Sequence, residues 1–324
     1  MFRYKDMIGR KDMPQSVFLE ASSRCQLRCP LCDTPGRKRR PGIIGWGHLT
    51  FAHFRRFLDG HPQIGHIGFS THGELFLNPE LRKIVAYASD KGVELSGISN
   101  LNTLSPSMAE CLVRSGFSRL TVAIDGADQR TYGKYRRGGN LLRVIKNIRL
   151  INRFKESCRS DTPVLTWQFV IFGHNEHQIA RARVMAFGLK MSFLTRLSWG
   201  ADYSPVRNRR DVVRESGLGV ASRKEFLETY GRSYFAPCLQ VWNSPQINWD
   251  GKLLGCCMNQ RAAFGNVFQS GLRDCMAGPS YRAWQDVIVG KRRLSPAVPC
   301  FGCEAYGSLA GKIRKRRKGV PAHL

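Results

Sequence analysis

The sequence Cys25-Gln-Leu-Arg-Cys29-Pro-Leu-Cys32 places three thiols on one short loop with C-x3-C-x2-C spacing. It follows Gln15–Ser22, QSVFLEAS, whose apolar residues predict a buried strand. Three thiolates on one loop can bind three irons of a [4Fe–4S] cube and leave the remaining iron open to another molecule. A structural zinc site normally takes four protein ligands, and no fourth ligand stands at the usual spacing. The loop therefore favours an iron–sulfur cluster over zinc.

Apolar strands and amphipathic helices alternate along the chain after this loop. The predicted strands are 15–22, 66–74, 93–100, 119–126, 164–172 and 192–200. The predicted helices between them are 49–61, 81–91, 105–116, 140–155 and 175–190. Strands separated by helices predict a parallel sheet with helical crossovers. The pattern predicts an α/β fold, a partial (β/α)6 TIM-like barrel.

Composition excludes several classes of protein. The 324 residues are 42% hydrophobic, enough for a sizeable core. No run reaches the roughly 18 apolar residues that span a bilayer, and the N-terminus has no apolar signal segment. We therefore expect a cytoplasmic protein without membrane insertion. In that setting the 11 cysteines indicate metal or redox use rather than disulfides.

The chain carries a large excess of basic residues. Lys and Arg number 51 against 24 Asp and Glu, a net charge of +27. This charge favours an anionic partner or substrate. Nucleic acid remains open as a partner, although no known RNA- or DNA-binding module accompanies the charge.

The cysteine loop and its placement resemble the radical S-adenosylmethionine (SAM) superfamily over about residues 15–200. The resemblance implies that Cys25, Cys29 and Cys32 bind a [4Fe–4S] cluster whose open iron chelates SAM. It also implies a set of cofactor contacts at the strand ends: Gly73, Glu74, Ser99, Asn100, Asp125, Gln168 and Asn175. The chain departs from the family pattern at Leu101, where a glycine is usual, and at Ala123, where a hydroxyl is often found.

The resemblance also implies the chemistry. A reduced cluster donates one electron to SAM, which gives methionine and a 5′-deoxyadenosyl radical, and that radical removes hydrogen from an unactivated C–H bond. Such enzymes take their electrons from a one-electron reductant such as flavodoxin or ferredoxin.

A second, dispersed set of cysteines lies in the C-terminal third. Its members are Cys238, Cys256, Cys300 and Cys303. Turn residues Asn248–Gly251 predict a hairpin that brings the first two together. Four thiolates suit a [4Fe–4S] cluster or an all-cysteine zinc site. Cys257 and Cys275 are interpreted as structural, although either could replace a ligand.

This second set resembles the twitch domain of some radical SAM enzymes, or the first half of a SPASM domain. Because no cysteine follows Cys303, we expect one auxiliary [4Fe–4S] cluster. The expected organisation is a radical SAM barrel at 1–200, a basic linker at 201–222, a small α+β twitch-like domain at 223–308, and a basic tail at 309–324.

The substrate pocket is expected at the carboxyl ends of the strands. Candidate lining residues are Trp199, Asp202 and Tyr203. His174 and His177 are interpreted as surface residues, because no third metal ligand is near them in sequence.

The leading hypothesis is oxidation or remodelling of a small polar, sugar- or nucleoside-like, anionic substrate, with the auxiliary cluster as electron acceptor. One alternative is epimerisation or crosslinking of a ribosomal peptide. The 14 residues before Gln15 leave little room for a leader-binding domain. Two further alternatives are an auxiliary cluster that donates sulfur and a non-catalytic iron–sulfur or zinc protein that binds nucleic acid.

Overall fold

The computed structural model describes residues 13–32, 42–69, 72–200 and 202–317. Its centre is a seven-stranded parallel sheet in the order β6-β5-β4-β3-β2-β1-β7. The strands are β1 Ser16–Leu19, β2 His66–Phe69, β3 Glu94–Ser99, β4 Arg119–Ala123, β5 Val164–Ile171, β6 Ser192–Leu197 and β7 Gln246–Ile247. The predicted parallel α/β fold is confirmed, and a seventh strand extends it beyond β1.

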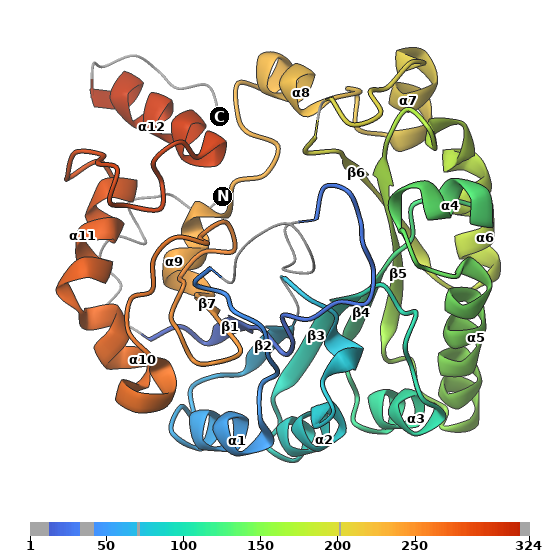
Figure 1. Ribbon diagram of the computed structural model, residues 1–324, viewed down its shortest axis with the longest axis horizontal. Helices are drawn as coiled ribbons and strands as arrows, with labels where there is room; N and C mark the ends of the chain where they lie inside the picture. Colours follow the sequence, from blue (N-terminus) through green and yellow to red (C-terminus); the bar gives the residue numbers. More distant parts are fainter. Residues whose placement is uncertain (1–12, 33–41, 70–71, 201, 318–324) are drawn as a thin grey trace.

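Helices cover the outer side of the curved sheet (Figure 1). They are α1 Phe51–Asp59, α2 Leu81–Asp90, α3 Pro106–Arg114, α4 Gln129–Tyr135, α5 Leu141–Ser157 and α6 Ile179–Gly188. Helices α1, α3 and α5 each begin after an N-cap residue whose side chain accepts a hydrogen bond from a backbone N–H of the first turn. In α3, for example, Ser105 accepts from Met108 N. Val144 and Ile148 lie on one face of α5 and are fully buried, as an amphipathic helix on a sheet requires.

The strands have a packed outer face and an open inner face. Phe193 of β6 lies beside Trp167, with ring centroids 6.4 Å apart, in the layer that packs against the helices. Alternate residues therefore point inward, among them Gln168 of β5, which is only half-buried. Ile98 of β3 is 42% exposed on the same inner face. The interior of the barrel is thus an accessible concave surface.

The C-terminal third is more helical than predicted. Its elements are α7 Arg209–Ser216, α8 Arg223–Tyr230, α9 Gln240–Asn243, α10 Val267–Ala277, α11 Pro279–Ile288 and α12 Glu304–Arg317. Helix α7 lies within the predicted basic linker, and α12 continues into the predicted basic tail. Tyr281, Trp284 and Ile288 bury one face of α11, which explains why this apolar run is helical.

The predicted hairpin at Asn248–Gly251 is confirmed, with Ile247 paired antiparallel to Leu253. Asn248 Nδ2 and Trp249 Nε1 each donate to the carbonyl oxygen of Ile44, at 2.8 Å. A neighbouring backbone bond joins Ser23 N to Gly47 O at 3.1 Å. The hairpin therefore braces the 42–47 segment, which in turn holds the chain just before the first cysteine.

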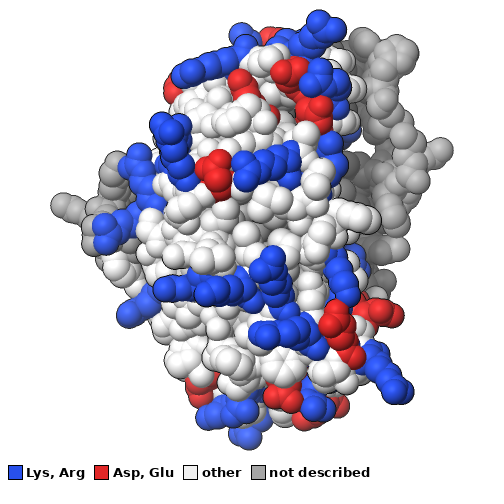
Figure 2. Space-filling model, turned by 90° about the vertical axis from the view of Figure 1, so that its right-hand side faces the viewer, with Lys and Arg blue, Asp and Glu red and all other residues white. Residues whose placement is uncertain are grey.

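No helix in the described ranges is long and apolar enough to cross a membrane. On the side of the molecule that carries α5 and α6, Lys and Arg side chains are spread over the surface with fewer Asp and Glu between them (Figure 2). Four of these cations, Lys146, Arg149, Arg153 and Lys190, line a groove between the two helices. On this face the basic charge is distributed rather than gathered at one site.

Candidate functional site

The first cysteine loop lies at the carboxyl end of β1. Its backbone is fixed by Arg28 N, which donates to Arg137 O at 2.9 Å, and by Cys32 N, which donates to Cys29 O at 3.1 Å. Cys25 and Cys29 are half-buried, while Cys32 is exposed. The loop therefore presents three thiols at the mouth of the barrel, as the sequence predicted.

The chemistry of these thiols fits an iron cluster. Burial raises the pKa of Cys25 to about 12 and also raises the pKa of Cys29, although Arg136 opposes the latter shift. Bare thiolates are disfavoured in such surroundings, and a bound metal supplies the charge that ionises them. No group of three His, Cys, Asp or Glu side chains among the described residues is arranged to hold a single metal ion. In a cubane each cysteine binds a different iron, so its thiolates need not converge on one ion.

Polar side chains surround two of the three sulfurs. Asn100 Nδ2 lies 3.7 Å from Cys25 Sγ and Arg136 Nη1 lies 3.9 Å from Cys29 Sγ, each placed to donate a hydrogen bond. Arg136 Nε also contacts Asp125 Oδ2 at 2.6 Å. Burial works against the charge on Arg136, but Asp125 and then Cys29 outweigh it and raise the pKa of the guanidinium. Arg136 is therefore a fixed cation beside the cluster loop.

The predicted SAM residues of β2 and β3 lie together. Glu74 is fully buried and accepts from Ser99 Oγ at 2.6 Å and from Asn100 N at 2.8 Å. Burial raises the pKa of Glu74, although these donors oppose the shift. Phe76 N also donates to Glu74, at 3.2 Å. A carboxylate has about four lone-pair sites, so these three bonds leave one site for an ammonium group.

Gly73 explains why Glu74 can sit so close to the cysteine loop. A Cβ at Gly73 would overlap the carbonyl oxygen of Ser22 and lie 2.8 Å from that of Arg24. Glu74 N donates to the same Arg24 oxygen at 2.8 Å. Only glycine permits this approach of the two backbones.

Two predicted cofactor residues, Asp125 and Asn175, form hydrogen bonds with protein groups. Asp125 is fully buried, bound to Arg136 and to Val170 N at 2.8 Å. Asn175 is also fully buried, and its amide bonds the backbone of Phe172, Val170 and Asp125. Their side chains satisfy backbone groups where β4 and β5 end, and their contact with the cofactor stays a prediction. Gln168 stays available on the inner face.

The predicted substrate residues border the cysteine loop. Trp199 is half-exposed, and its Nε1 donates to Leu31 O at 3.3 Å. Tyr203 packs edge-on against Phe172 at 5.5 Å and donates to Lys134 O at 3.1 Å. Asp202 is exposed. Trp199 therefore bonds to the loop and Tyr203 packs in the same cluster as Cys29 and Leu31, whereas Asp202 is exposed.

His174 differs from its prediction as a surface residue. It is half-buried, stacks on Phe172 with centroids 5.3 Å apart, and shares a hydrogen bond with Ser204 Oγ at 2.9 Å. His177 is exposed, as predicted.

The four cysteines of the second set line one cavity. Burial, together with the neighbouring thiols, raises the pKa of Cys238 to about 12. Trp284 Nε1 donates to Cys300 Sγ at 3.1 Å, and Cys303 N donates to Cys300 O at 3.1 Å. The tertiary structure thus brings together thiols that are 65 positions apart at their extremes, 238 and 303. Their donor set fits a fully ligated cluster.

The two uncommitted cysteines differ in position. The Cys257 thiol lies beside Cys256, while its backbone N–H bonds Gln240. Cys275 is buried on α10 against Gly265, away from that cavity. The structure therefore supports a structural role for Cys275 and leaves Cys257 adjacent to the ligand set.

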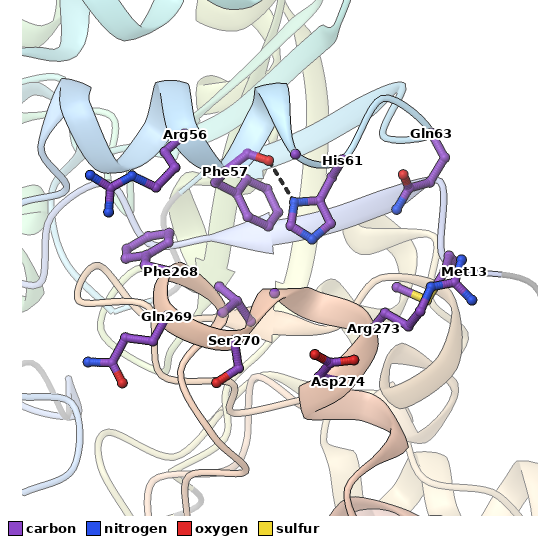
Figure 3. A pocket seen from close by; sticks show the side chains of 13 residues that line it. Met13, Arg56, Phe57, His61, Gln63, Phe268, Gln269, Ser270, Arg273 and Asp274 are labelled. Carbon is purple, nitrogen blue, oxygen red and sulfur yellow. Dashed lines mark hydrogen bonds between the residues drawn. The ribbon is translucent and has the colours of Figure 1, made fainter.

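A separate cavity of about 390 Å³ lies between α1 and α10 (Figure 3). His61 Nδ1 contacts Phe57 O at 2.6 Å, and Nε2 accepts from Leu272 N at 3.0 Å. Both bonds require a neutral ring with its proton on Nδ1. No cysteine lines this cavity. His61 therefore links α1 to α10 by hydrogen bonds and does not belong to the cysteine sites.

Sequence reasoning missed Arg136 and Trp284. Arg136 follows Tyr135 in a basic stretch, where a buried cation cannot be told from a solvated one. Trp284 stands three positions after Tyr281, a spacing that signals one buried helical face but not the thiol opposite it.

Residues 19–182 match the family model of the radical SAM superfamily, and residues 238–304 match that of SPASM, an iron–sulfur cluster-binding domain. An AdoMet-dependent heme synthase of Methanosarcina barkeri is 30% identical over 131 residues, 40% of this chain and 36% of that protein. A PqqA peptide cyclase of Rhodopseudomonas palustris is 27% identical over 118 residues, 36% of this chain and 30% of that protein. The chain thus spans about a third of the length of these curated relatives.

The crystal structure of Streptococcus suis SuiB bound to its precursor peptide SuiA shares the fold, with a TM-score of 0.64 and 14% identity over 96% of this chain and 75% of that one. The barrel match covers half of the sequence and contains the cysteine loop with the Gly73-Glu74 step, and the second match begins at Cys238. The chain therefore belongs to the radical SAM superfamily and carries a SPASM-type iron–sulfur domain, and this membership implies SAM and [4Fe–4S] clusters as cofactors.

Proposed function

We propose that this chain is an enzyme that cleaves SAM reductively and removes a hydrogen atom from a small polar substrate held inside the barrel. The observation that carries the proposal is the cysteine loop at the barrel mouth, directly beside the buried Glu74–Ser99–Asn100 group. The chemistry that the bound cluster and SAM supply is one-electron cleavage of a C–S bond, which yields methionine and a 5′-deoxyadenosyl radical.

The chain's own residues bind and orient the reactants. Cys25, Cys29 and Cys32 would hold the cluster, and Glu74 would pair with the methionyl ammonium of SAM. Gln168, on the inner face of β5, would meet the nucleoside. Trp199, which donates to Leu31 O, and Tyr203 would limit the access of water and of stray donors to a reactive radical.

The second cysteine cavity suggests an oxidation. Ligation by all of Cys238, Cys256, Cys300 and Cys303 would leave no open iron, which suits receipt of an electron rather than substrate binding. Loss of a hydrogen atom, a proton and an electron sums to a two-electron dehydrogenation, and a flavodoxin- or ferredoxin-like protein would supply the initiating electron. If one ligand were absent, an open iron could instead bind substrate or donate sulfur.

A second candidate function is modification of a ribosomal peptide. It is favoured by the similarity to a PqqA peptide cyclase and by the fold shared with a peptide-bound SuiB. A non-catalytic iron–sulfur or zinc protein that binds nucleic acid is the remaining candidate. SAM cleavage separates that last candidate from both enzymes, and product analysis with peptide or small-molecule pools separates the enzymes from each other.

The test is anaerobic reconstitution followed by metal analysis and measurement of 5′-deoxyadenosine after reduction. We expect about eight irons per chain, as two cubes require. Cys29→Ala should lose about half of the iron and all SAM cleavage. Cys256→Ala should lose the other cluster, and Cys275→Ala is the matched control that retains both. SAM cleavage by Cys29→Ala, or zinc in place of iron, would overturn the proposal.

A further inference from the structure

Arg196 places a positive charge on the inner wall of the barrel. It lies on β6, three residues after Phe193, whose ring packs in the outer layer with Trp167 and Phe169. Side chains alternate along a strand, so Arg196 points to the opposite, inner side. Its partner in the sheet register is Val170 of β5, and its side chain is exposed.

A second guanidinium reaches the same end of β6 from α8. Arg223 Nε donates to Leu197 O at 3.2 Å, and Leu197 follows Arg196 directly. The Arg223 guanidinium lies 5.2 Å from the centroid of the Tyr234 ring and 6.0 Å from that of Trp199. Burial, with a smaller contribution from Arg196, lowers the pKa of Arg223, while Tyr234 and Glu304 oppose the shift. Arg223 is thus half-buried against the strand position that directly follows the exposed Arg196.

Neither cation forms a salt bridge with any described carboxylate, although the cations around them do. Arg183 pairs with Glu215 and Arg209 with Glu225, both on elements next to β6. An anion bound at this end of β6 would be attracted by both cations. Arg223 uses Nε for Leu197 O, and the terminal N–H donors of a guanidinium match the geometry of carboxylate and phosphate oxygens.

We propose that Arg196 and Arg223 bind an oxyanion of the substrate, a carboxylate or a phosphate, beside the indole of Trp199. This inference rests on the proposed function, because it names the chemical group that the substrate presents to the barrel wall. It also assigns to Arg196 and Arg223 a role in selecting the substrate.

The position of the arginines favours substrate over SAM as the source of the anion. The methionyl end of SAM is assigned to Glu74 and Ser99, at β2 and β3. Strand β6 lies three strands beyond β3, about 14 Å along the sheet at the usual strand spacing. The carboxylate of SAM shares a carbon with its ammonium group, so it cannot span that separation.

The test measures binding of inorganic phosphate and of succinate to the reconstituted protein by calorimetry at fixed ionic strength. Arg196→Gln and Arg223→Gln should each weaken binding at least tenfold for whichever anion the wild type binds. Arg207→Gln is the matched control, since it removes an equally exposed charge from a nearby loop, and its affinity should stay within twofold. Binding of phosphate alone identifies a phosphorylated substrate, and binding of succinate alone identifies a carboxylate.

Two further measurements guard the interpretation. SAM affinity of Arg196→Gln should equal that of the wild type, and Arg223→Lys should keep the fold while losing the fork of donors. The proposal is overturned if both Gln variants bind the anions like the wild type, or if they lose SAM affinity alone. Absence of iron or of SAM cleavage would instead sink the proposed function, which is measured separately.

Discussion

The indole Nε1 of Trp284 donates a hydrogen bond to Cys300 Sγ at 3.1 Å inside the four-cysteine cavity. The indole cannot move away, because it stacks on Phe264 at 4.8 Å and meets Tyr281 edge-on at 5.7 Å. Tyr281 is in turn fixed by its hydroxyl, which donates to Val241 O at 2.6 Å. A rigid N–H donor is thus aimed at one predicted ligand of the auxiliary cluster.

Trp284→Phe should make the reduction potential of the auxiliary cluster more negative. The N–H group withdraws charge from the thiolate and so stabilises the reduced state, as hydrogen bonds to cluster sulfurs do. The measurement is a redox titration followed by electron paramagnetic resonance. The matched control is Trp167→Phe, because the buried Trp167 Nε1 donates to Ile124 O at 2.8 Å, on the barrel side. An equal potential in Trp284→Phe and the wild type would contradict the prediction.

Gly73→Ala should displace the cysteine loop. The new methyl group would overlap the Ser22 carbonyl, and overpacking of this kind typically costs about 1–3 kcal/mol. We expect less iron at the first site and lower thermal stability. Gly65→Ala is the control, since nothing lies within 4 Å of its added Cβ. Full iron occupancy in Gly73→Ala would show that the loop tolerates the shift.

Breaking the Asp125–Arg136 pair from one side should be costly. Asp125→Asn leaves a nearly buried guanidinium without its carboxylate, and removal of one partner from a buried pair costs about 3–5 kcal/mol. Urea unfolding measures this loss. Glu156→Gln is the control, because its pair with Lys190 is exposed and such pairs contribute less than about 1 kcal/mol. The double variant Asp125→Asn/Arg136→Gln should be more stable than Asp125→Asn alone, and a strictly additive loss would refute the coupling.

His174 should make stability fall in mild acid. Burial, followed by Lys134 and His177, lowers the pKa of His174 from 6.5 to about 4 in the folded chain. The unfolded chain therefore takes up this proton first, so the contribution is complete above pH 6.5 and is lost as the pH falls toward 4. The unfolding free energy of the wild type, minus that of His174→Gln, should shrink over that window. A difference that stays constant with pH would exclude the assignment.

Local sequence was sufficient for the parallel strands, the hairpin and the cysteine loop. The three thiols of C-x3-C-x2-C lie close together because they are only a few residues apart in the sequence. The spacing of apolar residues in the strands and helices shows which side of each element is buried. The Gly73-Glu74 step was predicted from the resemblance to the radical SAM superfamily, and the close approach of Gly73 to Ser22 shows why glycine stands there. The helices of the C-terminal third were not predicted, because short apolar runs there suit either element until packing selects one.

Packing alone decided the partners of the buried polar groups. The fold brings Arg136 and the Val170 N–H to Asp125, and it brings backbone groups of Asp125 and Val170 to Asn175. Trp284 meets Cys300 across the fold, and Arg223 of α8 reaches the carbonyl oxygen of Leu197 at the end of β6. The spacing of apolar residues shows which side of a helix or strand is buried, but it does not show which other element packs there. The packing partner depends on contacts that form only when the whole chain has folded.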